Sequence, residues 1–407
     1  MSFLDTEIFA RLFEVLALRA GYNANTVIAG TAVLGAAAGT VGTFVFLRGR
    51  ALISDALSHA TLPGIVLAFL VGSALGLQTR SLPLLLAGAT LSGLVGVLAM
   101  HALTRLPRIT EDAAIGAVLG SFFGLGVVLL SYVQTLPVGG QAGLKTFLLG
   151  QAAAMARTEA IAIAALAAAT IVLVVLFFKE FRLVAFDRDF AAGMGWPVSR
   201  IDLGMAALGV AVTVIGLQTV GLVLIVALLV VPPVAARFWS NDVKVVASLA
   251  AIFGALSAYL GAAASYAFAS MPTGAAIVLA AGAFVIFSLL FAPRRGVLGV
   301  ALATLRFRLD LLRVRWLAAI HTDPARSAVS GALLRTYLRI SGLIDRAGHP
   351  TAAARRLAPE AARNLELWIA ALARRPEAVP PGARFGVDPA EAVLPRDLVA
   401  EIGGRTP

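Results

Sequence analysis

The chain has 407 residues, of which 59% are hydrophobic and 14% are charged, and its formal net charge is +11. Soluble globular domains are usually about 45–50% apolar and about 25% charged. This composition and the mean hydropathy of +0.91 therefore exclude an ordinary soluble domain and indicate a polytopic membrane protein. Cysteine is absent, which excludes disulfide bonds and thiolate metal sites.

The first 24 residues predict an amphipathic helix that lies along the membrane surface. Apolar residues recur there at helical spacing, and charged residues interrupt the apolar core that a signal peptide would need. These charged residues are Asp5, Glu7, Arg11, Glu14 and Arg19.

Nine apolar segments follow, each long enough to cross a hydrocarbon core about 30 Å thick. They lie at about 25–48, 56–77, 81–103, 112–134, 158–179, 200–218, 220–238, 243–268 and 273–292. We therefore predict an all-α fold, with a polytopic bundle of about nine transmembrane helices at 25–293. A small, basic, helical cytoplasmic domain is expected at 294–407.

Two features interrupt the sixth and seventh segments. Only a short polar notch near Gly221 separates them. Pro232 and Pro233 remove backbone donors late in the seventh, which predicts a broken or kinked helix whose freed carbonyls face protein or a water-filled cavity. We expect Gly221 and Pro232 to mark a helix break along a pathway.

The distribution of Lys and Arg predicts the orientation of the chain. With nine spans, one set of connections holds twelve basic residues and the opposite set holds at most five. Because cytoplasmic loops carry the excess of basic residues, the N-terminus should lie outside and the C-terminus in the cytoplasm.

Asp55 and His59 lie one helical turn apart in the second predicted span. Residues four apart share a helix face, so the carboxylate and the imidazole can converge on one point. Ionisable groups inside an apolar segment are energetically costly and usually serve a pathway or an ion.

The energy source is not in this chain, because no intact nucleotide-binding P-loop occurs; residues 139–146 are a near match with a displaced lysine. The loop at 186–197 predicts a short amphipathic helix whose small-residue face is Ala191, Ala192 and Gly195. Such a helix can seat in a groove of a partner protein, and an ordinary loop is the alternative.

Three further polar residues lie near the ends of the third and fourth spans. Glu111 and Asp112 begin the fourth span, where a carboxylate complements the helix dipole. Capping is their expected role, with contact to a partner ATPase as a secondary one. His101 is expected to contact lipid headgroups at the membrane interface.

Five stretches add a more specific pattern: 50–69 (RALISDALSHATLPGIVLAF), 111–116 (EDAAIG), Asp187, Ala191 and Gly195 at intervals of four, 220–232 (VGLVLIVALLVVP), and 272–279 (PTGAAIVL). In this order they resemble the membrane permease subunits of the bacterial ABC importers for manganese, zinc and iron. The resemblance covers about residues 25–292. Pro233 and Met271 depart from the usual family pattern.

The resemblance implies a homodimeric permease in a bacterial inner membrane. It would work with a cytoplasmic ATPase subunit and an extracytoplasmic metal-binding protein, and it would contact membrane lipid. Asp55 and His59 would be the intramembrane metal ligands, and the loop at 187–195 would be the coupling helix that enters the ATPase. The divalent metal ion is then cargo rather than a permanent cofactor, ATP binds to the other subunit, and the chain is not an enzyme.

The donor types suit transit of a metal ion. One carboxylate oxygen and one imidazole nitrogen match a borderline divalent ion and admit manganese, zinc and iron alike. Two ligands per chain make a weak site from which the ion can leave, as conduction requires. The alternative is a structural hydrogen bond between Asp55 and a neighbouring Arg.

The C-terminal part, from Arg294 onward, contains 18 Arg, no Lys and 10 acidic residues. Its predicted helices lie at 305–320, 328–347, 353–373 and 389–402. Residues 357–368 and 388–398 faintly resemble parts of the iron-dependent repressor family, but 339–356 is too broken by Gly and Pro for a recognition helix. His321 and His349 also lack cysteine or acidic partners at useful spacing.

We therefore expect a degenerate regulatory or docking domain and do not expect nucleic acid as a partner. A DNA-binding domain and a basic face on anionic lipid remain the alternatives. For the whole chain, the alternatives are a proton-coupled secondary metal transporter, which would also use an intramembrane Asp/His pair, and a membrane-tethered transcription regulator.

Overall fold

The computed structural model describes residues 13–19, 21–48, 51–76, 82–136, 156–219, 221–268, 271–293, 295–323 and 328–403. The chain divides into two compact units, a membrane unit (Met1–Gly296) and a tail unit (Val297–Pro407). The described elements of both units are helices, which confirms the predicted all-α class.

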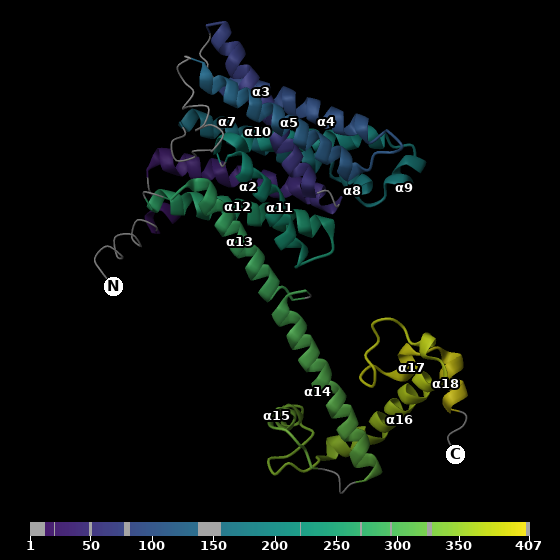
Figure 1. Ribbon diagram of the computed structural model, residues 1–407. Coiled ribbons are helices and arrows are strands. Elements are labelled where there is room, and N and C mark those ends of the chain that lie inside the picture. The colour runs from purple at the N-terminus through teal and green to yellow at the C-terminus, as the bar shows by residue number, and fades with distance from the viewer. Residues whose placement is uncertain are drawn as a thin grey trace. The chain divides into compact units, whose positions relative to one another are not determined.

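The helices of the membrane unit are α2 (Tyr22–Leu47), α3 (Ala51–Ala74), α4 (Leu82–Leu103), α5 (Glu111–Thr135), α7 (Arg157–Leu176), α8 (Phe178–Phe186), α9 (Arg188–Gly193), α10 (Val198–Thr219), α11 (Leu222–Arg237), α12 (Val243–Ala267) and α13 (Thr273–Phe291) (Figure 1). Among the described residues, eight helices are long and apolar enough to cross a membrane. The seventh predicted span is α11, which has 16 residues and is shorter than the roughly 20 that a spanning helix needs.

The centre of the membrane unit is formed by α2 and α3. The apolar stretches of these two helices are 72% buried, whereas that of α5 is 22% buried. Small residues allow the tight packing: Gly64 of α3 meets Gly88 of α4 backbone to backbone, so that a Cβ on either would collide with the other's carbonyl oxygen. The helices around this centre keep many Leu, Val and Phe side chains exposed, as surfaces that face lipid do.

The chain breaks between α10 and α11 at Gly221, whose φ of +87° favours glycine. The predicted break at Pro232 is not found, because α11 continues through Pro232 and Pro233 to Arg237. Proline at 233 cannot supply the amide that would bond the carbonyl of Leu229. That carbonyl oxygen packs against Gly42 of α2, so the freed acceptor faces protein.

The described part of the N-terminal segment, 13–19, packs on the membrane unit. The Tyr259 hydroxyl of α12 donates a hydrogen bond to the Leu16 carbonyl at 2.6 Å. Val15 is buried in a cluster with Ile28 and Ala262. Residues 1–12 and 20 of the predicted amphipathic helix lie outside the described residues.

The tail unit contains α14 (Val297–Thr322), α15 (Ala332–Ile340), α16 (Ala352–Arg374), a 3-10 turn (Pro376–Ala378), α17 (Ala390–Val393) and α18 (Arg396–Gly403). Two hydrophobic clusters hold it together, one between α14, α15 and the start of α16 and one between the end of α16 and the last two helices. The second helix is shorter than predicted because the chain turns at Gly342 (φ +70°) into a hairpin where Ile344 pairs with Pro350.

Candidate functional site

Asp55 and His59 lie on one face of α3, as the spacing predicts. The His59 Nε2 and the Asp55 Oδ1 are 3.3 Å apart, and the side chains are 17% and 42% exposed, respectively. The carboxylate is therefore accessible while the imidazole is largely enclosed. The His59 nitrogen and the Asp55 oxygen therefore lie together beside one point of the helix.

The imidazole of His59 is fixed by its surroundings but not saturated by them. The Phe123 ring of α5 packs edge-on against it, with ring centroids 4.7 Å apart. Its Nδ1 is buried and has no hydrogen-bond partner among the described residues. A buried polar nitrogen without a partner is costly in a static core, so the imidazole keeps an unused hydrogen-bonding or ligand atom.

The structural alternative for Asp55, an arginine partner, is not what the described residues show. The nearest basic residue along the chain with a described side chain, Arg48, is engaged elsewhere. Its Nη2 donates to Asp202 Oδ2 at 2.9 Å, and its Nη1 forms an ion pair with Asp202 Oδ1. The side chain that contacts Asp55 among the described residues is His59.

The pair also matches the bite of a single metal ion. Bonds of about 2.1 Å from an oxygen and a nitrogen to one ion, with the two donors 3.3 Å apart, subtend an angle close to the tetrahedral one. No group of three or more His, Asp or Glu side chains that could hold a metal occurs in the described parts of the chain. One chain thus offers two ligands and needs others to complete a coordination shell.

The predicted coupling helix is α9, and Asp187 caps it: the Asp187 Oδ1 accepts a hydrogen bond from the Phe190 amide at 2.8 Å. Gly195 ends the turn that follows, with a φ of +81°. The predicted small-residue face is only partly available to a partner, because Ala191 is fully buried in the core of the membrane unit. Ala192 and Gly195 are exposed.

Large apolar side chains stand out from this loop instead. We call them the apolar patch: Phe186, Phe190, Met194 and Trp196, all exposed. The patch was not predicted from the sequence, where only the small residues of the loop were singled out. The signal was present as large apolar residues at intervals of four, Phe186, Phe190 and Met194, although the extended backbone of Asp187 places Phe186 at the end of α8 and Phe190 in α9.

Glu111 and Asp112 occupy the first turn of α5, but the N-cap is Thr110, whose hydroxyl accepts from the Ala113 amide at 3.3 Å. Asp112 is exposed. Glu111 lines a small cavity of about 50 Å³ together with Arg188 and Asp202. The structure therefore brings Glu111 next to the start of α9, whereas Asp112 lies outside this cavity's lining.

His101 was expected to contact headgroups, and its ring contacts protein groups. Its Nε2 lies 2.6 Å from the Ser199 hydroxyl of α10 and 3.1 Å from the Arg105 guanidinium. His101 thus joins α4 to α10.

Asp202 is a buried, charged residue near the predicted coupling helix that sequence reasoning missed. It is a carboxylate in α10 with 7% of its side chain exposed, and it is shared by Arg48 and Arg188, the latter through a 2.7 Å contact to Oδ2. The available signal was an acid inside an apolar span, the same signal that singled out Asp55.

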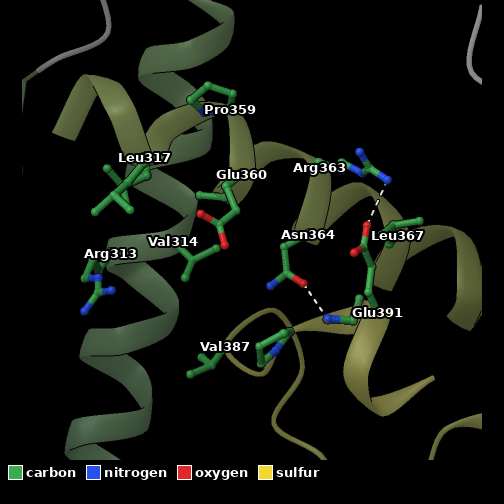
Figure 2. A pocket seen from close by; sticks show the side chains of 14 residues that line it. Arg313, Val314, Leu317, Pro359, Glu360, Arg363, Asn364, Leu367, Val387 and Glu391 are labelled. Carbon is green, nitrogen blue, oxygen red and sulfur yellow. Dashed lines mark hydrogen bonds and ion pairs between the residues drawn. The ribbon is translucent and has the colours of Figure 1, made fainter. Parts of the chain in front are cut away.

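The tail unit contains a larger cavity, of about 510 Å³, between α14, α16 and the segment that leads into α17 (Figure 2). Asn364 at its edge is used structurally: its amide nitrogen donates to the Gly386 and Asp388 carbonyls and its oxygen accepts from the Ala390 amide. An Arg363–Glu391 ion pair of 2.8 Å also borders it.

The expectation that His349 has no acidic partner is wrong. The hairpin brings its Nδ1 within 4.0 Å of Asp345 Oδ2. The His349 amide also donates to Asp345 Oδ1 at 2.8 Å, and this hydrogen bond lowers the pKa of the Asp345 carboxyl. The pair stabilises the turn and has no third ligand among the described residues.

Comparison with known families and proteins agrees with the geometry. The ABC 3 transport family matches residues 22–292. The chain is 42% identical over 311 residues to the manganese transport system membrane protein MntC of Bacillus subtilis, covering 76% of this chain and 70% of that protein. It is 43% identical over 287 residues to the zinc transport system membrane protein TroC of Treponema pallidum, and the match covers 70% of this chain and 95% of that protein.

Solved structures give the same architecture. PsaBC from Streptococcus pneumoniae, solved in complex with Fab, has a TM-score of 0.59 and 31% identity, with 70% of this chain and 97% of that chain covered. A putative metal-chelate type ABC transporter in an inward-facing conformation has a TM-score of 0.53 at 15% identity and supports the fold alone. The family match ends at residue 292, before the tail unit begins.

Proposed function

The chain belongs to the ABC 3 transport family, and from this premise we propose that it carries divalent manganese or zinc ions across a bacterial inner membrane. Its fold is that of an ABC importer permease, and relatives named for manganese and zinc transport cover most of the membrane unit. The observation that carries the choice of cargo is the Asp55–His59 pair on the buried helix α3.

The two side chains act as a transient chelate. The Asp55 carboxylate supplies charge that replaces part of the ion's hydration, and His59 supplies a nitrogen that manganese and zinc both accept. Because one chain gives two ligands, the ion keeps water or takes ligands from a second permease copy in a dimer. A symmetric dimer would place up to four ligands around one ion, and loss of the symmetry would release it.

Transport is driven by ATP hydrolysis on a separate ATPase subunit that seats on the apolar patch around α9. A short helix flanked by exposed aromatic and Met side chains is suited to burial in a groove. Glu111, in the first turn of the neighbouring helix α5, also contributes to this contact with the ATPase. An extracytoplasmic protein delivers the metal on the opposite face. If α11 crosses the membrane as a short ninth span, the N-terminus lies on that face and the C-terminal tail unit lies in the cytoplasm.

The test is metal uptake into vesicles that contain the permease, its ATPase and its binding protein. We expect uptake of radioactive manganese or zinc that requires ATP and persists when the proton gradient is dissipated. Uptake that depends on the proton gradient and does not require ATP would instead establish a secondary transporter. Reporter fusions after Pro407 that are active only when exported would contradict the orientation.

A further inference from the structure

We propose that Asp202 is a positioning residue of the transport cycle, which links the coupling helix α9 to the point where α2 leads into the metal-binding helix α3. This inference rests on the proposed function and adds a route between its two sites. The end of α2 meets the consecutive helices α9 and α10, which lie far from it in the sequence, at one buried carboxylate.

The geometry of the link is specific. Arg48 is the C-cap residue of α2, and its guanidinium engages both oxygens of Asp202. Arg188 is the first residue of α9 and reaches Oδ2 of the same carboxylate at 2.7 Å. Charge-assisted contacts of this fork type are short and directional, so a shift of α9 changes the arrangement of the shared carboxylate and its second arginine.

The two arginines differ in how deeply their side chains are buried. Arg48 and Asp202 are both nearly buried, at 9% and 7%, whereas Arg188 is 47% exposed. A buried ion pair is costly to break, so the Arg48–Asp202 contact acts as the fixed half. A half-exposed arginine contributes little to stability, so Arg188 is the half that can move with α9.

The buried Arg48–Asp202 pair lies close to the start of α3, the proposed metal-binding helix. Only two residues separate Arg48 from the first helical residue of α3, Ala51, and Asp55 follows one turn later. Ile53 of α3 lines the same 50 Å³ cavity as Arg188 and Asp202. This small cavity gives the cluster room to rearrange, which a close-packed core would not.

The experiment uses the full chain with its ATPase and binding protein in vesicles, and compares metal ions imported per ATP hydrolysed. Arg188→Gln removes the movable contact and leaves the buried pair intact, so folding is preserved. We expect the ratio to fall by about fivefold or more, the lower end of ordinary coupling between sites. Arg188→Lys should retain most of the ratio because it keeps a charge within reach of the carboxylate.

The matched control is Arg200→Gln, which removes an exposed arginine from the first turn of α10, two residues before Asp202. It should leave the ratio unchanged. Equal ratios for Arg188→Gln and Arg200→Gln would overturn the proposal, and so would an Arg188→Lys variant as defective as Arg188→Gln. A loss of ATPase activity and uptake in proportion to protein abundance would also overturn it, because a structural role alone has that effect.

A second measurement separates the link from the transport function. The chain contains no cysteine, so spin labels can be placed through Ala192→Cys on α9 and Leu52→Cys on α3, two exposed positions. Their distance distribution should broaden when Arg188→Gln is added. An unchanged distribution overturns the link, whereas absent ATP-driven uptake in the parent protein contradicts the proposed function and leaves the distance result to decide the link.

Discussion

Gly35 of α2 and Gly254 of α12 pack backbone to backbone, so that a Cβ added to either would collide with the carbonyl oxygen of the other. No other residue type fits this crossing without separating the two helices. Because α2 is one of the two most buried membrane helices, the contact fixes the centre of the membrane unit.

We expect Gly35→Ala to reduce the amount of folded permease in membranes, because overpacking a close-packed site costs about 1–3 kcal/mol. The measurement is the detergent-resistant, monodisperse fraction after solubilisation. Gly120→Ala on α5 is the control, since a Cβ there has no neighbour within 4 Å. Equal losses in both variants would show that the crossing tolerates a Cβ.

Asp55→Ala and His59→Ala should each reduce metal uptake to the level of vesicles without permease, while protein abundance stays near the parent value. The reason is that each removes one of only two ligands that the chain supplies. Uptake and abundance should be measured on the same membranes. Val71→Ala, an exposed apolar position on the same helix, is the control, and normal uptake in both ligand variants would remove the metal pathway from α3.

Gly195→Ala should weaken coupling through the backbone alone. A Cβ there meets nothing within 4 Å, but the φ of +81° is strained for alanine, at about 1–2 kcal/mol. We expect less ATPase bound per permease in pull-down assays. Gly193→Ala is a close control, because Gly193 is equally open and its φ is not in the left-handed region; a similar defect there would mean that the turn geometry is not the cause.

The loop at 384–388 should lose stability at acid pH. The Arg384 amide donates to Asp388 Oδ2 at 2.9 Å and its guanidinium donates to Oδ1, and these bonds hold the pKa of the Asp388 carboxyl below its ordinary value. A carboxyl with a lowered pKa stabilises the fold above the unfolded pKa of about 3.9, and the contribution disappears as the pH falls through the folded pKa.

Asp388→Asn should therefore make this loop more sensitive to protease at pH 7, and the difference from the parent should shrink towards acid pH. Asp397→Asn is the control, since Asp397 is exposed and pairs with Arg375 at 3.3 Å on the surface, where ion pairs contribute little. A parent-like digestion pattern for Asp388→Asn at pH 7 would contradict the role of the carboxylate.

Hydropathy was enough to place the membrane helices, because length and apolar composition are set by the bilayer rather than by neighbouring helices. All nine predicted segments coincide with helices, with boundaries that differ by a few residues. The break at Gly221 was predicted from the sequence, and α11 starts directly after it. The continuation of α11 through Pro232 escaped prediction, because packing against α2 stabilises what proline disfavours.

The site was predictable where it depends on spacing within one helix, as for Asp55 and His59. It was not predictable where it depends on which side chains from distant segments meet. Arg48, Arg188 and Asp202 span more than 150 residues, and no local pattern pairs them. The inward turn of Ala191 likewise depends on the side of α9 that packs against the core.

That inward turn has a consequence for how the complex is made. Ala191 is buried, whereas the side chains of the apolar patch are exposed. A newly synthesised permease therefore exposes an aggregation-prone aromatic surface until its ATPase covers it. We expect the orphan subunit to cluster or to be degraded, and its yield to rise when both subunits are produced together. The loop proposed to couple the permease to its ATPase would then also ensure that only complete transporters accumulate.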